Sequence, residues 1–157
     1  MDIFNILGLT PETTEIVAKL SIALLLGMVI GIERIIAHKT AGMRTHALVS
    51  MGAALFVIVG EIVSAHYISS AGINPDPLKM ASNIIVGVGF LGAGMIIFKD
   101  SHLMGLTTAS GLWVAAGIGI AVGFGLYPIA ITATVLTLFI FTVLWYVELL
   151  IRKISDK

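Results

Sequence analysis

The chain contains no cysteine and few charged residues. Without cysteine it has no disulfide, no thiol nucleophile, no iron–sulfur cluster and no thiolate zinc site. Asp, Glu, Lys and Arg make up 11% of the 157 residues, where a soluble domain carries about 25%. Nine basic residues balance nine acidic ones, so the basic surface of a nucleic-acid-binding protein is missing. We therefore expect neither a soluble enzyme nor a nucleic-acid partner.

Apolar side chains dominate the sequence instead. Hydrophobic residues account for 58% of the chain, and the mean hydropathy is +1.07. A soluble domain of this length cannot bury so much apolar surface, because small domains leave much of their surface exposed. Lipid admits only helices and closed barrels, and the alternating pattern of barrel strands is missing here. The composition predicts an all-α polytopic membrane helix bundle, surrounded by the lipid bilayer, as a single domain over residues 1–157.

Stretches without charge delimit five predicted membrane spans. Between Asp100 and Glu148 lie 47 residues without a charged side chain. As one helix they would measure roughly 70 Å against a hydrocarbon core of ~30 Å, so this stretch crosses twice, with a Gly- and Pro-containing turn at 123–128. Thr10, followed by Pro11, is the predicted N-cap of the first helix. The predicted spans are 16–32, 47–68, 80–98, 107–122 and 128–151.

Lysine and arginine concentrate on one side of these five spans. Arg34, Lys39 and Arg44 lie between the first two spans, Lys99 follows the third, and three more basic residues lie in the C-terminal tail. Because Lys- and Arg-rich loops stay in the cytoplasm, we expect the N-terminus outside and the C-terminus in the cytoplasm. The N-terminus lacks the basic region of a cleavable signal peptide, so we expect none.

Small residues recur at helical spacing in the third and fourth spans. The fourth span predicts a smooth stripe on which a neighbouring helix packs closely, formed by Gly111, Ala115 and Gly119. The glycines of the third span imitate a dinucleotide-binding fingerprint, but the strand that this motif requires is missing. Two roles remain for the glycines of the third span: they allow close helix packing, or they mark a locally opened helix whose carbonyls face a polar cavity. These glycines are Gly87, Gly89, Gly92 and Gly94.

Two opposite charges lie at similar depth in the first two spans. Lys19 is about one turn into the first span, and Glu61 lies toward the same end of the second. A charge in the membrane interior costs about 2.5–3.5 kcal/mol on insertion scales, so such residues pair or face a cavity. Either the two side chains form an ion pair, or both extend to the outer interface.

Polar residues also gather at the predicted cytoplasmic ends of the spans. Glu33 and Arg34 end the first span, Arg44 and Thr45 open the second, and the pair Thr107 and Thr108 opens the fourth. They either converge into a polar vestibule or serve only as topology signals that bind anionic lipid headgroups.

Other polar residues give weaker signals. Asn83 is the only amide in the third span, and it either bonds a neighbouring helix or contacts a ligand. The four histidines lack metal-site spacing, and no nucleophile stands with a base and an orienting group. We expect no enzymatic activity, no metal and no cofactor.

Three ordered blocks resemble the MgtC/SapB family. They are Gly31–Val49 (GIERIIAHKTAGMRTHALV), Val86–Gly94 (VGVGFLGAG) and Gly105–Gly119 (GLTTASGLWVAAGIG). The first matches the family's G-x-E-R and A-G-x-R-T stretches, and the other two match its third-span and fourth-span blocks. By motif match, the positions carried over from the family are Glu33, Arg34, Gly42, Arg44, Thr45, Gly89, Gly92, Gly94, Thr107 and Thr108.

The resemblance implies a five-span protein of the bacterial inner membrane with a periplasmic N-terminus. The family is linked to adaptation to low magnesium and, in pathogens, to survival inside macrophages, and some members are thought to bind other membrane proteins, including the ATP synthase. The best-known members continue into a soluble cytoplasmic domain, which we expect this chain to lack. His46 stands where the family often has Asn, and Lys79 and Asn83 stand where Arg and Gln are common.

Two functions follow as hypotheses. The favoured one is a regulatory membrane protein that acts by helix contacts with a second copy, preferably as a dimer, or with another membrane protein. The stripe on the fourth span is its expected contact surface. The alternative is a small channel or carrier for magnesium or phosphate, with Glu33, Arg44, Thr107 and Thr108 at its mouth.

Overall fold

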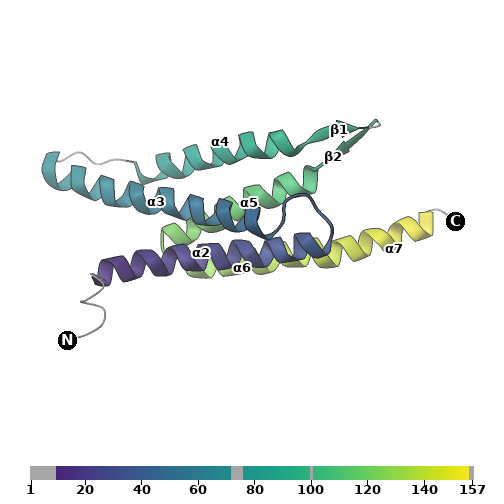
Figure 1. Ribbon diagram of the computed structural model, residues 1–157, viewed down its shortest axis with the longest axis horizontal. Helices are drawn as coiled ribbons and strands as arrows, with labels where there is room; N and C mark the ends of the chain where they lie inside the picture. Colours follow the sequence, from purple (N-terminus) through teal and green to yellow (C-terminus); the bar gives the residue numbers. More distant parts are fainter. Residues whose placement is uncertain (1–9, 72–75, 100, 156–157) are drawn as a thin grey trace.

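The computed structural model describes residues 10–71, 76–99 and 101–155. Within them, five helices are long and apolar enough to cross a membrane, which confirms the predicted all-α class and its five spans. The first and the last described helices begin and end at opposite ends of an elongated bundle (Figure 1). The candidate spans are Pro11–Ile36, Met43–Ile68, Leu78–Met95, Leu106–Gly123 and Tyr127–Ile154.

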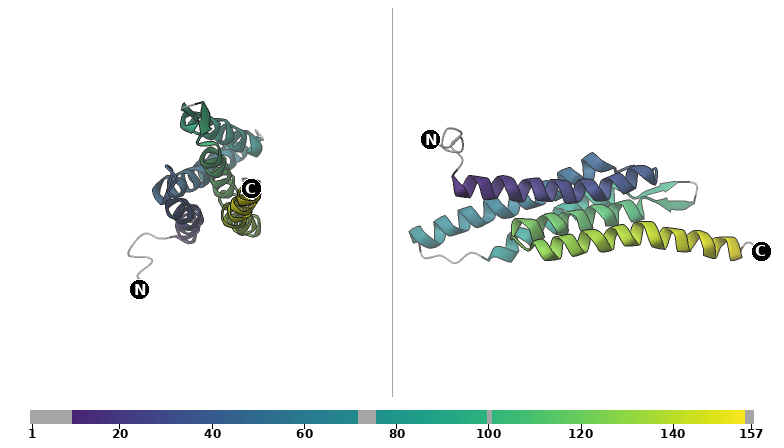
Figure 2. Two further views of the ribbon diagram at one scale, coloured as in Figure 1. Left: turned by 90° about the vertical axis from the view of Figure 1, so that its right-hand side faces the viewer. Right: turned by 90° about the horizontal axis from the view of Figure 1, so that it is seen from below.

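The helices run alternately up and down the bundle. The last span is one long rod in which a π-helical segment, η1, separates two α-helices (Figure 2). The helical elements are α2 (Pro11–Ile36), α3 (Met43–Ala71), α4 (Pro77–Met95), α5 (Leu106–Gly123), α6 (Tyr127–Phe139), η1 (Ile140–Leu144) and α7 (Trp145–Ser155).

Side-chain caps set the starts of two helices. Thr10 caps α2, as predicted, because its hydroxyl accepts a hydrogen bond from the Thr13 backbone N–H at 3.2 Å. Asp76 caps α4 in the same way, accepting from the Leu78 N–H at 2.9 Å. In both helices a proline follows the cap, where its missing N–H costs nothing.

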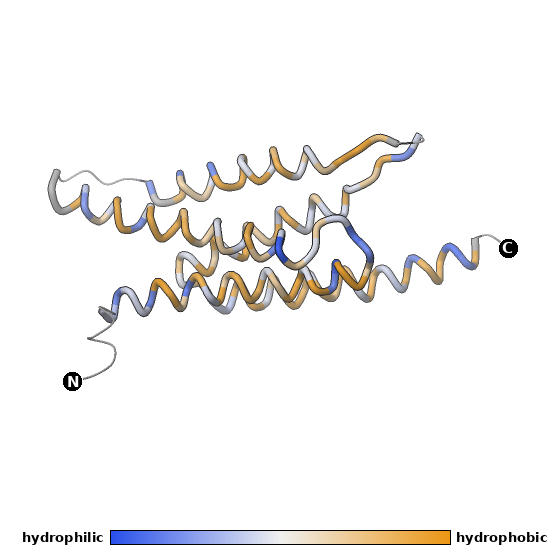
Figure 3. The backbone as a smooth tube through the Cα atoms, viewed as in Figure 1, coloured by the Kyte–Doolittle hydropathy of each residue, from blue (hydrophilic) through white to orange (hydrophobic). Residues whose placement is uncertain are grey.

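Helix α5 forms the centre of the bundle, in contact with α2, α3, α4 and α6 (Figure 2). Its small side chains let these neighbours approach closely, and residues such as Leu112, Ala115 and Val122 are buried. The outer surfaces of the other helices are apolar and exposed, as a lipid-facing surface requires. Hydrophilic residues lie mostly toward the two ends of the bundle (Figure 3).

The predicted third span, 80–98, is corrected at its C-terminal end. Helix α4 ends at Met95, and the next residues form an antiparallel hairpin of β1 (Ile97–Lys99) and β2 (His102–Met104). Gly105 then has a φ of +91°, and a Cβ at this glycine would overlap the Met95 carbonyl oxygen. The start of α5 thus crosses directly over the end of α4, and the hairpin makes the reversal between them.

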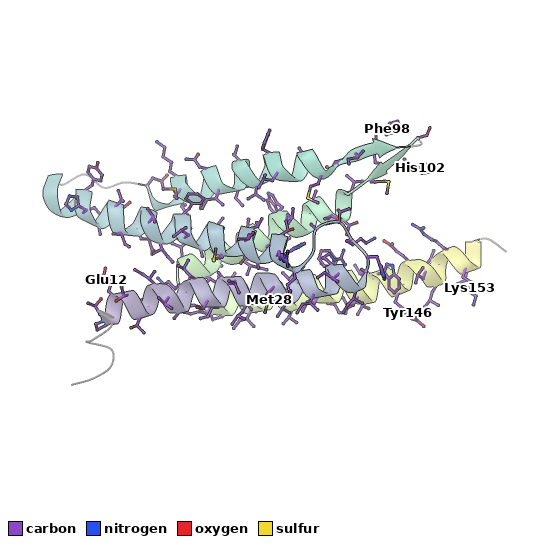
Figure 4. The ribbon with its side chains drawn as sticks, viewed as in Figure 1. Glu12, Met28, Phe98, His102, Tyr146 and Lys153 are labelled. Atoms are coloured by element: carbon purple, nitrogen blue, oxygen red, sulfur yellow. The ribbon has the colours of Figure 1, made fainter. Side chains whose placement is uncertain are left out.

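The hairpin lies at the end of the bundle that also holds the α2–α3 loop and the end of α7 (Figure 1). Phe98 pairs with Leu103, and Lys99 pairs with His102. Phe98 and His102 lie at this outer end of the molecule (Figure 4). We call it the basic end, because it collects Arg34, Lys39, Arg44, Lys99, Arg152 and Lys153.

Candidate functional site

A buried arginine lies at the basic end of α2. Arg34 is only 2% exposed, and its Nε donates a hydrogen bond to the carboxylate of neighbouring Glu33. The Arg34 guanidinium carbon also lies 3.5 Å from the centre of the Phe141 ring, which comes from η1. A cation over an aromatic face is attracted to it, more strongly where water is excluded. Charge and ring together join the end of α2 to the last span.

Two further polar side chains are buried beside this pair, one turn apart on α3. His46 Nδ1 lies 3.0 Å from the Gly42 carbonyl oxygen, so the ring nitrogen donates to that carbonyl. Among the described residues, His46 Nε2 and Ser50 Oγ have no hydrogen-bond partner although both are buried. A buried polar atom without a partner costs about 1–3 kcal/mol, so this part of the core is polar at a net cost.

We call the buried Arg34, His46 and Ser50 side chains the polar core. Glycines of α5 make room for it. A Cβ on Gly111 would lie 3.2 Å from His46 Nε2 and 3.0 Å from Phe141 Cζ. A Cβ on Gly119 would overlap the carbonyl oxygen of Ser50. The stripe predicted on the fourth span, with Ala115 fully buried between these glycines, therefore packs against the chain's own α3 and η1.

This placement corrects one expectation. The stripe formed by Gly111, Ala115 and Gly119 was expected to offer the contact surface for a partner, and it is already covered by the chain's own helices. The spacing of small residues identified the packing face of the helix correctly. It did not identify the helix that packs on this face, because spacing along one helix carries no information about its neighbours.

The predicted vestibule residues divide into two groups. Glu33, Arg34 and Gly42 lie at the polar core, where the Gly42 carbonyl accepts from His46. Arg44 and Thr45 are exposed, and Arg44 lines a shallow apolar groove with residues of α2 and α3 such as Met28.

The two threonines of α5 lie elsewhere again. Thr107 is exposed and Thr108 is buried, and both line a groove at the basic end together with His38, Lys39 and Thr40. The seven residues of this candidate cluster thus occupy three separate places, and a vestibule shared by all of them was one of the two alternatives that the sequence left open.

The charges in the first two spans do meet. Lys19 Nζ lies 3.9 Å from a carboxylate oxygen of Glu61 and 3.1 Å from one of Glu15. The lysine side chain is 13% exposed, whereas the Glu61 side chain is 43% exposed. Of the two alternatives, the ion pair between the spans is therefore the one observed. Glu15, one turn before Lys19 on the same helix, is a partner that the sequence reasoning did not consider.

The glycines of α4 behave differently from those of α5. Only Gly92 approaches another helix, since its Cβ would lie 3.5 Å from the Ala109 side chain. For Gly87, Gly89 and Gly94, nothing lies within 4 Å of where a Cβ would stand. Close packing within the chain thus holds for one of the four positions, and the helix is intact at all of them.

An apolar groove of 610 Å³ runs between α3 and α4, and we call it the α3–α4 groove. Gly52 of α3 and Gly87 of α4 line it, and neither has a neighbour within 4 Å of its Cβ position. Asn83 lies exposed at one end, where it also lines a second groove that contains Glu61 and Lys79. The described residues contain no cluster of three or more His, Cys, Asp or Glu side chains that could hold a metal.

His46, Ser50 and Phe141 are the functional candidates that sequence reasoning missed. A signal existed for the first two, because their spacing of four residues places them on one face of a helix. Phe141 had no such signal, since it is one apolar residue in a long apolar run.

Comparison with known proteins agrees with the family resemblance of the three sequence blocks. A family model described as the MgtC family matches residues 20–149. The chain belongs to the MgtC family. This confirms the resemblance to MgtC/SapB proteins and makes the chain a multi-pass membrane protein of a bacterial family.

Members of the MgtC family with substantial identity come from several bacteria. Escherichia coli K12 has "Putative magnesium transporter YhiD", 40% identical over 83% of this chain and 61% of the relative. "Protein MgtC" of Brucella abortus is 40% identical over 75% of this chain and 46% of the relative. "Protein SapB" of Bacillus subtilis is 38% identical over 90% of this chain and 60% of the relative.

This MgtC-family chain thus matches about half to three fifths of the length of these relatives. No solved structure matches it.

Proposed function

We propose that the chain is a regulatory membrane protein that acts through contacts between transmembrane helices, in adaptation to low magnesium. The observation that supports this role is the α3–α4 groove, which is apolar, open along the bundle and lined by glycine from both helices. Glycine at a helix surface lets another backbone approach closely, which is how helices associate where lipid removes the hydrophobic driving force.

The proposed occupant of the groove is α4 of a second copy. Beside the groove, α4 carries Val86 and Phe90, which are 73% and 80% exposed. A two-fold arrangement places the same helix on both sides of the contact, so that the projecting side chains of one copy face the groove of the other. Asn83 at the groove's end adds an amide that can hydrogen-bond across the contact.

The proposed orientation has the basic end in the cytoplasm of a bacterial cell and the N-terminus outside the inner membrane. Its support is the gathering of six basic residues at one end of the bundle, on the end of α2, the α2–α3 loop, the start of α3, the hairpin and α7. Positively charged loops resist transfer across the membrane, and the opposite end carries fewer basic residues, Lys19 and Lys79, together with Glu12, Glu15 and Asp76.

Cysteine cross-linking tests the proposed contact directly, because the chain has no cysteine of its own. The variant is Gly87→Cys, and the matched control is Gly89→Cys, also open but about 200° around the helix. We expect oxidation in native membranes to yield a covalent dimer for Gly87→Cys and much less for Gly89→Cys. Equal cross-linking at both positions, or none at either, contradicts the contact.

Magnesium transport is the second candidate, favoured by the name of the Escherichia coli relative. Magnesium flux into proteoliposomes tests it, with Glu33→Gln as the variant and Arg44→Gln as the control, since Arg44 lies away from the polar core. Flux above empty liposomes that falls only in Glu33→Gln would favour transport over regulation. The absence of flux from folded, inserted protein would favour regulation.

A further inference from the structure

A groove of 760 Å³, separate from those described above, lies at the basic end of the bundle, and we call it the loop groove. The α2–α3 loop forms one wall, and the end of α4, the hairpin and the first turn of α5 form the others (Figure 1). Its polar lining consists of His38, Lys39 and Thr40 from the loop and Thr107 and Thr108 from α5. No carboxylate is among the described residues that line it.

The cationic wall of the loop groove is held in a defined conformation. The His38 N–H donates to the Ile35 carbonyl at 3.0 Å, and the Lys39 N–H donates to the Arg34 carbonyl at 2.9 Å. With His38 at a φ of 55°, these two bonds make the C-terminal motif that usually carries glycine at this position. The backbone at Lys39 is therefore held in place, because its N–H donates to the carbonyl of the buried Arg34.

The opposite wall is the N-terminus of a long helix. The hydrogen-bond ladder of α5 begins with the Ala109 N–H, which donates to Gly105 at 2.8 Å. The N–H groups of residues 106–108 precede it, and Gly105 supplies no side-chain cap. Such a helix end carries partial positive charge and attracts anions.

Thr108 provides an independent sign that this groove takes a ligand. The residue is 3% exposed and lines the groove, no described residue hydrogen-bonds its hydroxyl, and its oxygen is not among the fully buried side-chain atoms without a partner. The oxygen therefore opens onto the groove, where an unpaired hydroxyl is available as a donor. A ligand oxygen in the groove would accept from this hydroxyl.

We propose that the loop groove binds a phosphate group, either inorganic phosphate or the headgroup of an anionic phospholipid. Lys39 supplies the charge, the first N–H groups of α5 supply directed donors, and Thr108 donates from its hydroxyl. Phosphate suits this combination because it offers several strong acceptor oxygens to one cation and one helix end. The site lies on different residues from the α3–α4 groove, so it does not depend on the proposed dimer.

The test measures binding of two probes to the purified chain. In one arm, protein in neutral detergent is dialysed against labelled inorganic phosphate. In the other, nanodiscs of phosphatidylcholine with phosphatidylglycerol are prepared, and retained anionic lipid is counted by native mass spectrometry. The variants are Lys39→Gln and Thr108→Val. The matched controls are Arg44→Gln and Thr45→Val, which remove a positive charge and a hydroxyl close by but outside the groove.

We expect binding in at least one arm, weakened on the order of ten-fold in each groove variant and unchanged in both controls. Binding in the first arm identifies free phosphate, and binding in the second arm alone identifies a lipid headgroup. Lys39→Arg and Thr108→Ser, which keep the charge and the hydroxyl, restore binding and show that the loss is not misfolding. No binding in either arm, an equal loss in Arg44→Gln, or full binding by Thr108→Val would overturn the assignment.

Discussion

Helices α4 and α5 carry similar runs of glycine and use them in opposite ways. On α5, Gly111 and Gly119 lie against other parts of the same chain, and a methyl group at Gly119 would overlap the backbone of α3. On α4, Gly87, Gly89 and Gly94 have open space where a methyl group would stand. Glycine density in a membrane helix therefore marks a surface of close approach without saying whether the chain itself fills it.

The difference follows from position in the bundle. Helix α5 lies in the middle, so its small residues set how closely four neighbours approach. Helix α4 lies at the side and contacts only α3 and α5 in the described part of the chain, apart from weaker contacts. Gly87, Gly89 and Gly94 lower the stability of this helix without a compensating contact inside the monomer. We interpret Gly87, which lines the α3–α4 groove, as part of a surface reserved for something outside the chain.

The largest expected effect is at Gly119. Replacement by alanine pushes a methyl group into the Ser50 carbonyl, so we expect the free energy of unfolding to fall by about 1–3 kcal/mol. The matched control is Gly117→Ala on the same helix, where no atom lies within 4 Å of the Cβ position. Equilibrium unfolding in mixed micelles measures both variants. Equal stability of the two would mean that α5 is not held against α3 at this point.

A smaller effect is expected at Gly111, and it depends on Phe141. The methyl group of Gly111→Ala would meet the Phe141 ring at 3.0 Å, which needs only a small shift, so we expect a loss of about 1 kcal/mol or less. In a Phe141→Leu background the space opens on the side of the ring, so we expect the same change to cost less, with His46 Nε2 at 3.2 Å as the remaining close neighbour. A double-mutant cycle measures this coupling. Additive losses would show that the ring and the glycine do not meet.

The smallest effect, opposite in sign, is expected on α4. Gly89→Ala adds a methyl group into open space and removes the flexibility of glycine, so we expect stability to rise by about 0.5 kcal/mol. The same unfolding measurement applies, and Gly92→Ala, with Ala109 at 3.5 Å, serves as the comparison with a filled neighbour. Destabilisation by Gly89→Ala would show that α4 has a neighbour on that face.

Much of the fold could be predicted from sequence because its signals are local. Charge-free stretches gave five spans, and Thr10 before Pro11 gave the first cap. The pairing of Lys19 with Glu61 was one of two alternatives, since depth along a span can be estimated from residue count. The hairpin was missed because residues 96–98 are apolar and continue the hydrophobic run of the third span.

The site was less predictable because it depends on which face of each helix meets a neighbour. His46 and Ser50 are buried, whereas Arg44 and Thr45, two residues and one residue before His46, are exposed. In a membrane helix both the core face and the lipid face are apolar, so the pattern that orients a soluble helix is weak. Only the assembled bundle shows that Arg34 lies over the Phe141 ring and that Thr108 lines the loop groove.

The π-helical segment η1 has a consequence for the residues that follow it. Up to this point one stripe of the last span is buried, through Ala130, Thr134, Thr137 and Phe141. In a regular α-helix the residue seven positions after Phe141, which is Glu148, would continue that stripe. A π-turn acts as a one-residue insertion that changes the angular phase of the later residues by about 100°. The insertion thus rotates the acidic Glu148 away from the line that leads to Arg34, and within the described residues the carboxylate paired with the buried guanidinium is that of Glu33.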